Sequence, residues 1–324
     1  MTKSLIGRRT LLITLLISLM LIVLAGYLHP SFRRPDVPPV AEWHMINVNG
    51  GGLQGDANLL LVGDRVVMID AGLRPGASRS VVPYLKDLGI RKIHHFFIST
   101  PRPSADEGLG VLIKAGLVVE NLYFHPIDMT ASPSGQYNPD ILGHYGAFID
   151  LARTDGTSLY PITAGFVLEL PNQVRIRVIA AGANDPVTVT SRPGDAAMLL
   201  RMELPRSSVL FGGGTGAELG SELASRDDLH AAFYKAPPPV PDAAPVSLLD
   251  AIEPEFVLVP GAKRHWCGDA GTVAREWAIE HETPIWVTGT NGHVRIIWQS
   301  RQVMVLPQTQ NEICKLREFG NLIQ

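Results

Sequence analysis

Short apolar runs separated by glycine, aspartate and proline fill the chain from residue 42 onward. The first three runs, residues 43–48, 57–62 and 66–69, have the length of strands and turn-forming residues between them, which predicts an antiparallel meander. Residues 78–88 then carry apolar side chains at helical spacing, and residues 93–98 return to a strand pattern. The globular part is therefore expected to begin with strands, a helix and a further strand.

Strand and helix patterns continue to residue 298. Helices are expected at residues 108–115, 141–153, 217–223, 247–252 and 272–280, and strands at residues 118–124, 166–170, 175–181, 196–204, 208–211, 232–236 and 256–259. Residues 285–288 and 294–298 are predicted to form a terminal hairpin. Because the second half repeats the order of paired strands, helix, strand and loop, the pattern predicts an α/β protein with two β-layers, each backed by helices.

The first forty residues differ from the rest. Residues 11–28 are almost entirely apolar and follow the basic residues Lys3, Arg8 and Arg9. At about 1.5 Å per residue, a helix of this length nearly crosses a bilayer core of about 30 Å. Since no Ala-x-Ala cleavage site follows, residues 1–29 are predicted to be an uncleaved signal anchor with a single transmembrane helix, and a buried helix of a soluble protein is the alternative.

The charges around this segment predict its orientation. A short basic N-terminus stays in the cytoplasm, so the globular part is expected on the extracytoplasmic, periplasmic side of the cytoplasmic (inner) membrane. Arg33 and Arg34, which follow the apolar run, weaken this charge asymmetry. Residues 30–41 are Pro-rich and predict an extended spacer. The globular domain is then expected at residues 42–300, followed by a C-terminal extension at residues 301–324.

Composition limits the possible partners. The 324 residues carry a formal net charge of −3, with a sequence pI near 6.4, so no concentrated basic surface is expected. Phosphate binding needs clustered lysine and arginine, and direct nucleic-acid binding is therefore not supported. The expected partners are the membrane, through the N-terminal helix, and a protein assembly of the cell envelope.

The chain has two cysteines, Cys267 and Cys314. One bridge between them is compatible with an oxidising compartment and would contribute about 3–4 kcal/mol to stability. Two unpaired, half-buried thiols are the alternative. Two cysteines are in either case too few for a thiolate metal site.

Several short motifs, taken together, resemble a known fold. They are Val48-Asn49-Gly50, Gly55-Asp56-Ala57, residues 68–72 (MIDAG), residues 82–90 (VPYLKDLGI), residues 195–211 and residues 288–294. In order and spacing they resemble the metallo-β-lactamase fold superfamily, and within it the hydrolase-like domain of ComEC-type competence proteins. The resemblance extends over residues 45–298 and implies a four-layer αββα sandwich.

The resemblance also implies where metal ligands would stand. Members of this superfamily bind two zinc ions through a His-x-His-x-Asp-His cluster after the strand that follows the first helix, together with ligands from the second half. In this chain the cluster falls on Arg102, Ser104, Asp106 and Glu107. Of these four positions, only Asp106 has the residue type that the superfamily cluster has there. Arginine brings a cation to the place of a metal ion, and serine is a poor zinc ligand.

The later ligand positions depart from the superfamily pattern in the same way. The bridging aspartate falls on Gly214, and a histidine pair falls on Pro238 and Pro239, which have no side-chain donor. The last histidine falls near Gly268, and His265 close by is a single ligand without companions. No catalytic residue is therefore assigned. The residues of the degenerate cleft are Arg102, Ser104, Asp106, Glu107, Asp70, Gly214, Pro238 and His265, with Arg102, Arg264 and His265 as candidates for binding an anion.

Two functions follow from this pattern. The first is a membrane-anchored, exported protein that has lost the zinc ligands and serves as a binding or scaffolding pseudoenzyme, with no cofactor. The alternative is a metal-dependent hydrolase, similar to a phosphodiesterase or nuclease. Its divalent metal ion (Mg²⁺, Ca²⁺ or Mn²⁺) would be bound by the carboxylates of Asp70, Asp106 and Glu107. Against the alternative, the aspartate at the position of Asp70 usually supports the site from behind the metal ligands in this fold.

Overall fold

The computed structural model describes residues 38–49, 55–126, 139–182, 194, 196–240, 244–299, 302–310 and 314, with the backbone only at residues 139–145. The chain divides into two compact units, Met1–Pro39 and Val40–Gln324. The predicted anchor, residues 1–29, lies outside the described residues. Within the described ranges, no helix is both long and apolar enough to cross a membrane.

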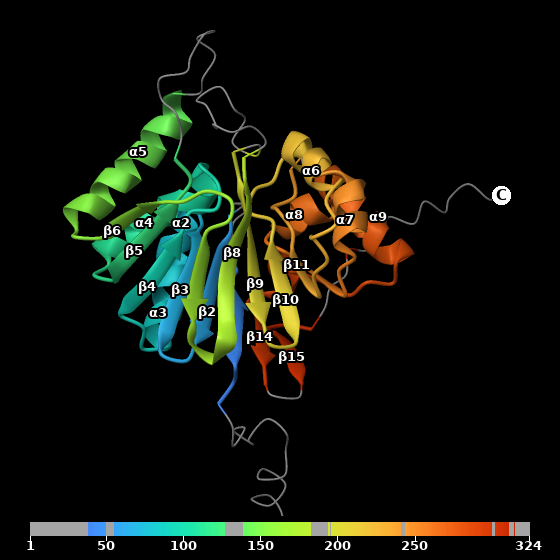
Figure 1. The fold of residues 1–324 in the computed structure, drawn as a ribbon, viewed down its shortest axis with the longest axis horizontal. Coiled ribbons are helices and arrows are strands. Elements are labelled where there is room, and N and C mark those ends of the chain that lie inside the picture. Colours follow the sequence, from blue (N-terminus) through green and yellow to red (C-terminus); the bar gives the residue numbers. More distant parts are fainter. Residues whose placement is uncertain are drawn as a thin grey trace, which may run out of the picture. The chain divides into compact units, whose positions relative to one another are not determined.

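The first sheet has the strand order β15-β14-β1-β2-β3-β4-β5-β6 in the described part of the chain (Figure 1). Its strands are β1 (Ala41–Met45), β2 (Ala57–Val62), β3 (Arg65–Ala71), β4 (Lys92–Phe97), β5 (Val118–Phe124), β6 (Ser158–Pro161), β14 (Val294–Trp298) and β15 (Val303–Pro307). The antiparallel meander predicted for β1, β2 and β3 is confirmed, and β3 to β6 run parallel. The carboxyl ends of these parallel strands therefore meet at one edge of the sheet.

The second sheet has the order β13-β12-β11-β10-β9-β8-β7. Its strands are β7 (Val167–Leu170), β8 (Val174–Ala181), β9 (Met198–Leu204), β10 (Ser207–Phe211), β11 (Phe233–Lys235), β12 (Phe256–Val259) and β13 (Ile285–Val287). The strands from β7 to β10 are antiparallel, whereas those from β10 to β13 are parallel. This sheet thus repeats the division of the first one into an antiparallel and a parallel part.

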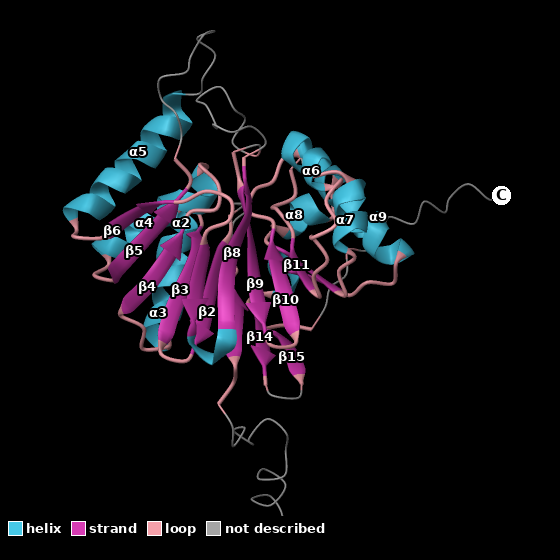
Figure 2. Ribbon diagram, in the orientation of Figure 1, coloured by secondary structure: helices cyan, strands magenta, loops and turns pink. Residues whose placement is uncertain are grey.

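Helices cover the outer faces of both sheets (Figure 2). The first sheet carries α2 (Arg74–Gly76), η3 (Ala77–Val81), α3 (Val82–Asp87), α4 (Pro103–Lys114) and α5 (Pro139–Thr154), and the second carries α6 (Ala217–Leu223), α7 (Val246–Ile252), α8 (Lys263–Trp266) and α9 (Thr272–Glu280). Short turns of helix are η4 (Pro171–Gln173), η5 (Asp269–Gly271) and α10 (Thr288–Asn291).

Three apolar clusters hold the four layers together. The central cluster joins the facing sides of the two sheets, and in it the rings of Trp43 on β1 and Phe211 on β10 meet edge to face at 5.0 Å. A second cluster packs the first sheet on its helices, for example through Leu109 of α4, and a third packs the second sheet on α7 and α9. The architecture is the αββα sandwich that the sequence resemblance implies.

Two sequence-based expectations about elements are wrong. Residues 285–288 and 294–298 do not form a hairpin, because β13 is the edge strand of the second sheet while β14 pairs with β1 in the first. The helix expected from residue 108 begins at Pro103, a residue favoured at the first position of a helix. In addition, β6 and β15 were not predicted. β15 lies in the expected C-terminal extension and pairs with β14.

A disulfide bond joins Cys267 to Cys314, with 5.4 Å between the Cα atoms and a sequence separation of 47 residues. Of the two alternatives for the cysteines, the structure has the bridged one. The loop that the bond closes contains β13 of the second sheet and β14 and β15 of the first. The bond thus connects the segment after the last strand to the residue that follows α8.

Replacing both cysteines by serine is expected to lower the free energy of unfolding by about 4 kcal/mol, because the unfolded chain regains the freedom of a loop of 47 residues. Urea denaturation of the oxidised protein and of the Cys267→Ser/Cys314→Ser variant measures this difference. A reducing agent should destabilise the wild-type protein and leave the variant unchanged. Equal stability of the oxidised and reduced wild-type protein would contradict the prediction.

Candidate functional site

The candidate site lies where strands of both sheets end. Asp70 stands near the end of β3, Ser99 and Thr100 follow β4, and Lys235 is the last residue of β11. The turn Gly212–Gly214 follows β10, and its backbone reaches the first sheet: the Gly214 N–H donates to Thr100 Oγ1 at 2.7 Å. Loops at the carboxyl ends of parallel strands are the usual place for chemistry in α/β proteins.

Asp70 ties the ends of two neighbouring strands together. It has a φ of 61°, a left-handed conformation that is uncommon outside glycine. Its carboxylate accepts hydrogen bonds from the Ser99 N–H at 2.8 Å and from Ser99 Oγ at 2.5 Å. Burial raises the pKa of Asp70 to about 7, and the neighbouring charge of Asp56 adds to this effect. The carboxyl group of Asp70 is thus engaged in holding the end of β4.

A buried ion pair crosses from one sheet to the other. The Lys235 ammonium on β11 bonds to Asp56, just before β2, and also to the Gly213 carbonyl oxygen at 3.2 Å. Both residues are almost completely buried, with relative exposures of 1% for Lys235 and 3% for Asp56. Burial raises the pKa of Asp56, against the attraction of Lys235, which lowers it. The other carboxylate oxygen accepts from Asn58 Nδ2 at 2.8 Å.

Asp106 is the third buried carboxyl group of the cluster. It lies in the first turn of α4, which is pressed so closely onto β3 that a Cβ on Gly108 would come within 2.2 Å of the Ala71 oxygen. Neither carboxyl oxygen of Asp106 has a hydrogen-bond partner among the described residues. Burial raises its pKa to about 8, with repulsion from Asp70 and Glu107 as further causes. The neutral acid is therefore the main form at pH 7.

The other residues predicted around Asp106 have structural contacts. Arg102 is the extended residue before α4, and its carbonyl oxygen accepts from the Asp106 N–H at 3.1 Å. The Ser104 carbonyl oxygen accepts from the Asp56 N–H at 3.1 Å. Glu107 turns to α2, where its Oε2 accepts from the Arg74 N–H at 3.2 Å. Asp106 and Glu107 thus face different surroundings.

The remaining predicted positions, Gly214, Pro238 and His265, do not form a group of metal ligands. A Cβ on Gly214 would lie 2.9 Å from Thr100 Oγ1, so an aspartate does not fit there without a shift of Thr100. Pro238 is buried and supplies no side-chain donor. His265 lies on α8, where Arg264 Nε donates to its Nε2 at 3.0 Å. Among the described residues, no group of three or more His, Cys, Asp or Glu side chains could hold a metal ion.

The donor set does not fit a pair of zinc ions. It contains no imidazole, and two of its carboxylates are already bound, Asp56 to Lys235 and Asp70 to Ser99. The ammonium of Lys235 also puts a positive charge inside the cluster, where it would repel a dication. Sequence reasoning predicted Asp70 and Asp106 but missed Lys235. The available signal was a single lysine within the otherwise apolar run Phe233–Ala236.

Comparisons with known proteins bear on the fold. No family model and no curated protein matches the sequence. Among solved structures, the metallo-β-lactamase fold protein YhfI from Bacillus subtilis is 12% identical with a TM-score of 0.53, over 76% of this chain and 96% of that one. CmlA, a diiron β-hydroxylase from Streptomyces venezuelae, is 10% identical with a TM-score of 0.48, over 85% and 55%. Zn²⁺-bound PqqB from Methylobacterium extorquens is 11% identical with a TM-score of 0.45, over 72% and 84%.

The likeness to YhfI identifies the fold. At 12% identity a similarity over nearly the whole length of YhfI is one of fold, and it extends to neither activity nor ligands. The protein has the metallo-β-lactamase fold, as its sequence motifs predicted. The finer resemblance to ComEC-type domains stays a prediction.

The Lys235→Met variant should lose about 3–5 kcal/mol of stability, because it leaves the Asp56 carboxylate buried without its partner. The Lys235→Met/Asp56→Asn double variant should recover part of this loss, and urea denaturation of the two single variants and the double variant measures the coupling. The exposed pair Arg226–Asp228 is the control, for which Arg226→Met should cost less than about 1 kcal/mol. Additive costs at Lys235 and Asp56 would contradict the buried pair.

Asp106 should make stability fall as the pH rises. A carboxyl group with a folded-state pKa of about 8 is protonated in the folded protein between pH 4 and pH 8, while the unfolded chain has already released that proton. The contribution of the Asp106 carboxyl group to the free energy of unfolding is thus greatest below about pH 4 and is lost toward pH 8. Asp106→Asn is expected to raise the free energy of unfolding more at pH 8 than at pH 5. Asp228→Asn is the exposed control, and an equal effect of Asp106→Asn at both pH values would refute the assignment.

Proposed function

We propose that this protein is a metallo-β-lactamase-fold pseudoenzyme, which has lost zinc-dependent hydrolysis and serves as a binding or scaffolding protein. The observation that carries the proposal is the buried Lys235–Asp56 pair in the cluster of carboxyl groups at the strand ends. The ammonium of Lys235 neutralises the Asp56 carboxylate, so the cluster has less of the net negative charge that a dication needs there.

The chemistry of the loops agrees with this function. Zinc-dependent hydrolysis needs an ion held by imidazole and carboxylate ligands, with one position open for a water molecule whose pKa the ion lowers. At the corresponding positions Arg102 is a cation, Gly214 has no side chain and Pro238 has no donor. Two of the three buried carboxyl groups are instead joined in contacts that hold the strand ends, Asp70 with Ser99 and Asp56 with Lys235.

We further propose that the protein is anchored in the cytoplasmic membrane by residues 1–29 and carries its domain on the extracytoplasmic side. The apolar run at residues 11–28 and the basic residues before it support this location. The disulfide bond adds support, because such bonds persist in oxidising compartments. A protein assembly of the envelope is the proposed partner. The net charge of −3 gives no support for direct binding of nucleic acid.

A second candidate function is a metal-dependent hydrolase with a carboxylate-rich site, similar to a phosphodiesterase or nuclease. One observation favours it: the buried carboxyl group of Asp106 has no hydrogen-bond partner among the described residues. Another opposes it. Glu107 Oε2 already accepts a hydrogen bond from the Arg74 N–H.

Metal analysis of the full-length protein, purified in detergent, separates the two functions. A pseudoenzyme should contain substoichiometric zinc, manganese and iron by mass spectrometry, and should not hydrolyse bis(p-nitrophenyl) phosphate with added Mn²⁺. The matched variant Asp106→Asn should have the same metal content and the same background rate as the wild-type protein. A stoichiometric ion, or Mn²⁺-dependent hydrolysis that Asp106→Asn abolishes, would overturn the proposal in favour of the second function.

A further inference from the structure

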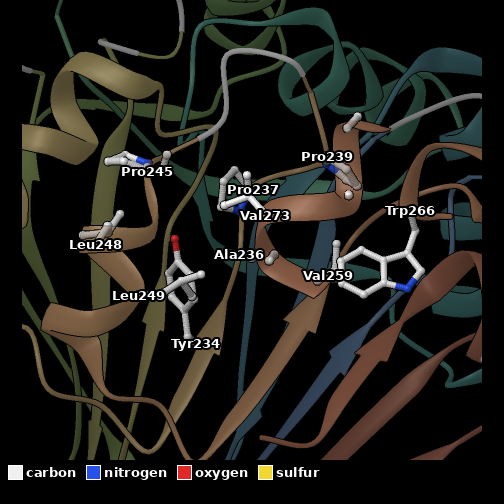
Figure 3. A pocket seen from close by; sticks show the side chains of 14 residues that line it. Tyr234, Ala236, Pro237, Pro239, Pro245, Leu248, Leu249, Val259, Trp266 and Val273 are labelled. Atoms are coloured by element: carbon white, nitrogen blue, oxygen red, sulfur yellow. The ribbon is translucent and has the colours of Figure 1, made fainter. Parts of the chain in front are cut away.

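A small apolar cavity lies on the helix-covered face of the second sheet, beneath the loop that follows β11 (Figure 3). Its volume is about 40 Å³, which is room for about three water-sized groups. Apolar side chains from α7, β12 and α8 and from the proline loops form part of its wall: Pro237, Pro245, Leu248, Leu249, Val259 and Trp266. None of the described residues that line it is charged.

Among the described residues that line the cavity, Tyr234 alone carries a side-chain hydroxyl group. The residue is 1% exposed, and its hydroxyl makes no hydrogen bond to any other described residue. In Figure 3 the oxygen lies on the side of the ring that faces Pro237 and Pro245. Burial raises the pKa of Tyr234, so the hydroxyl keeps its proton and remains a donor. The described residues thus offer this hydroxyl no acceptor, and a ligand with an acceptor atom in the cavity would supply one.

The cavity is separate from the cluster of carboxyl groups. Successive residues of a strand point to opposite faces, so Tyr234 packs under the helices while Lys235 reaches Asp56 on the inner side. The cavity and the cluster of carboxyl groups nevertheless share a wall, at the turn that begins with Gly212. A Cβ on Gly212 would lie 2.9 Å from the Tyr234 hydroxyl, and Gly212 begins the turn whose Gly213 oxygen accepts from Lys235.

We propose that this cavity is a binding site for a compact, uncharged, mostly apolar molecule that carries one carbonyl oxygen. The apolar wall excludes a charged group, which would be buried without a counter-charge. The carbonyl oxygen accepts the hydrogen bond of the Tyr234 hydroxyl. A water molecule has one non-hydrogen atom, so room for about three water-sized groups corresponds to about three or four non-hydrogen atoms, and the ligand is a small ketone or amide, or the end of a larger molecule of that kind.

Acetone is the probe, and isopropylamine, a cation of the same size, is the matched control. Saturation-transfer NMR on the full-length protein in detergent should show saturable binding of acetone and none of isopropylamine. Tyr234→Phe keeps the ring and removes the donor, and should weaken acetone binding about five- to tenfold. Tyr160→Phe, at a tyrosine that is 42% exposed, should leave binding unchanged.

A filled cavity gives a second test. Ala274→Phe places a ring into the wall of the cavity and should abolish acetone binding. Thermal unfolding of each variant verifies that the variant is folded. If Ala274→Phe does not fold, the binding measured for Tyr234→Phe is the test of the proposal. Binding that is absent in the wild-type protein, unchanged in Tyr234→Phe or retained in a folded Ala274→Phe overturns the proposal. These outcomes are independent of metal content and hydrolysis, so this site and the pseudoenzyme proposal can fail separately.

Discussion

The buried ion pair between Lys235 and Asp56 is the constraint on which the arrangement of this end of the molecule depends. It is the point where a strand of the second sheet is bonded to the start of a strand of the first, deep inside the sandwich. From Asp56 the bonds continue through Asn58 to the indole nitrogen of Trp43 in the central core. Two charges taken out of water are tolerated only when they are paired and further hydrogen-bonded, so the backbone around them has little freedom to move.

The Lys235–Asp56 pair also explains the contacts that the surrounding residues make. The positive charge of the lysine ammonium between the sheets weakens the attraction of the neighbouring carboxyl groups for an external cation. These groups take part in holding strand ends and helix starts. Thr100 fills the space beside Gly214, and Glu107 turns away to Arg74. Asp106 alone stays without a partner among the described residues, and burial keeps it largely neutral. The electrostatics of the cluster are therefore balanced mainly by internal groups.

Sequence reasoning predicted most elements of the fold, because apolar periodicity is local. The meander of β1 to β3 and the helix at residues 272–280 follow from such patterns. Which sheet a strand joins depends on contacts far along the chain, and for that reason β13 and β14 were wrongly paired. The start of α4 was predicted at residue 108 instead of Pro103, whereas Gly108 lies inside the helix and is required for close packing on β3. Of the site, Asp70 and Asp106 could be predicted from motif positions, but the partner of Lys235 could not, since 179 residues separate the two ends of that bond.

The disulfide bond has a consequence for how the domain carries mechanical load. Cys314 precedes the last ten residues, and its bond leads directly to Cys267 beside α8. A pulling force on the C-terminal end therefore enters the molecule at α8 and bypasses β15, an edge strand that would otherwise be peeled away one hydrogen bond at a time. At the other end, force along the chain enters at β1, in the interior of the first sheet between β14 and β2. Tension between the two ends thus acts on β1 and α8 and leaves the edge strand β15 unloaded.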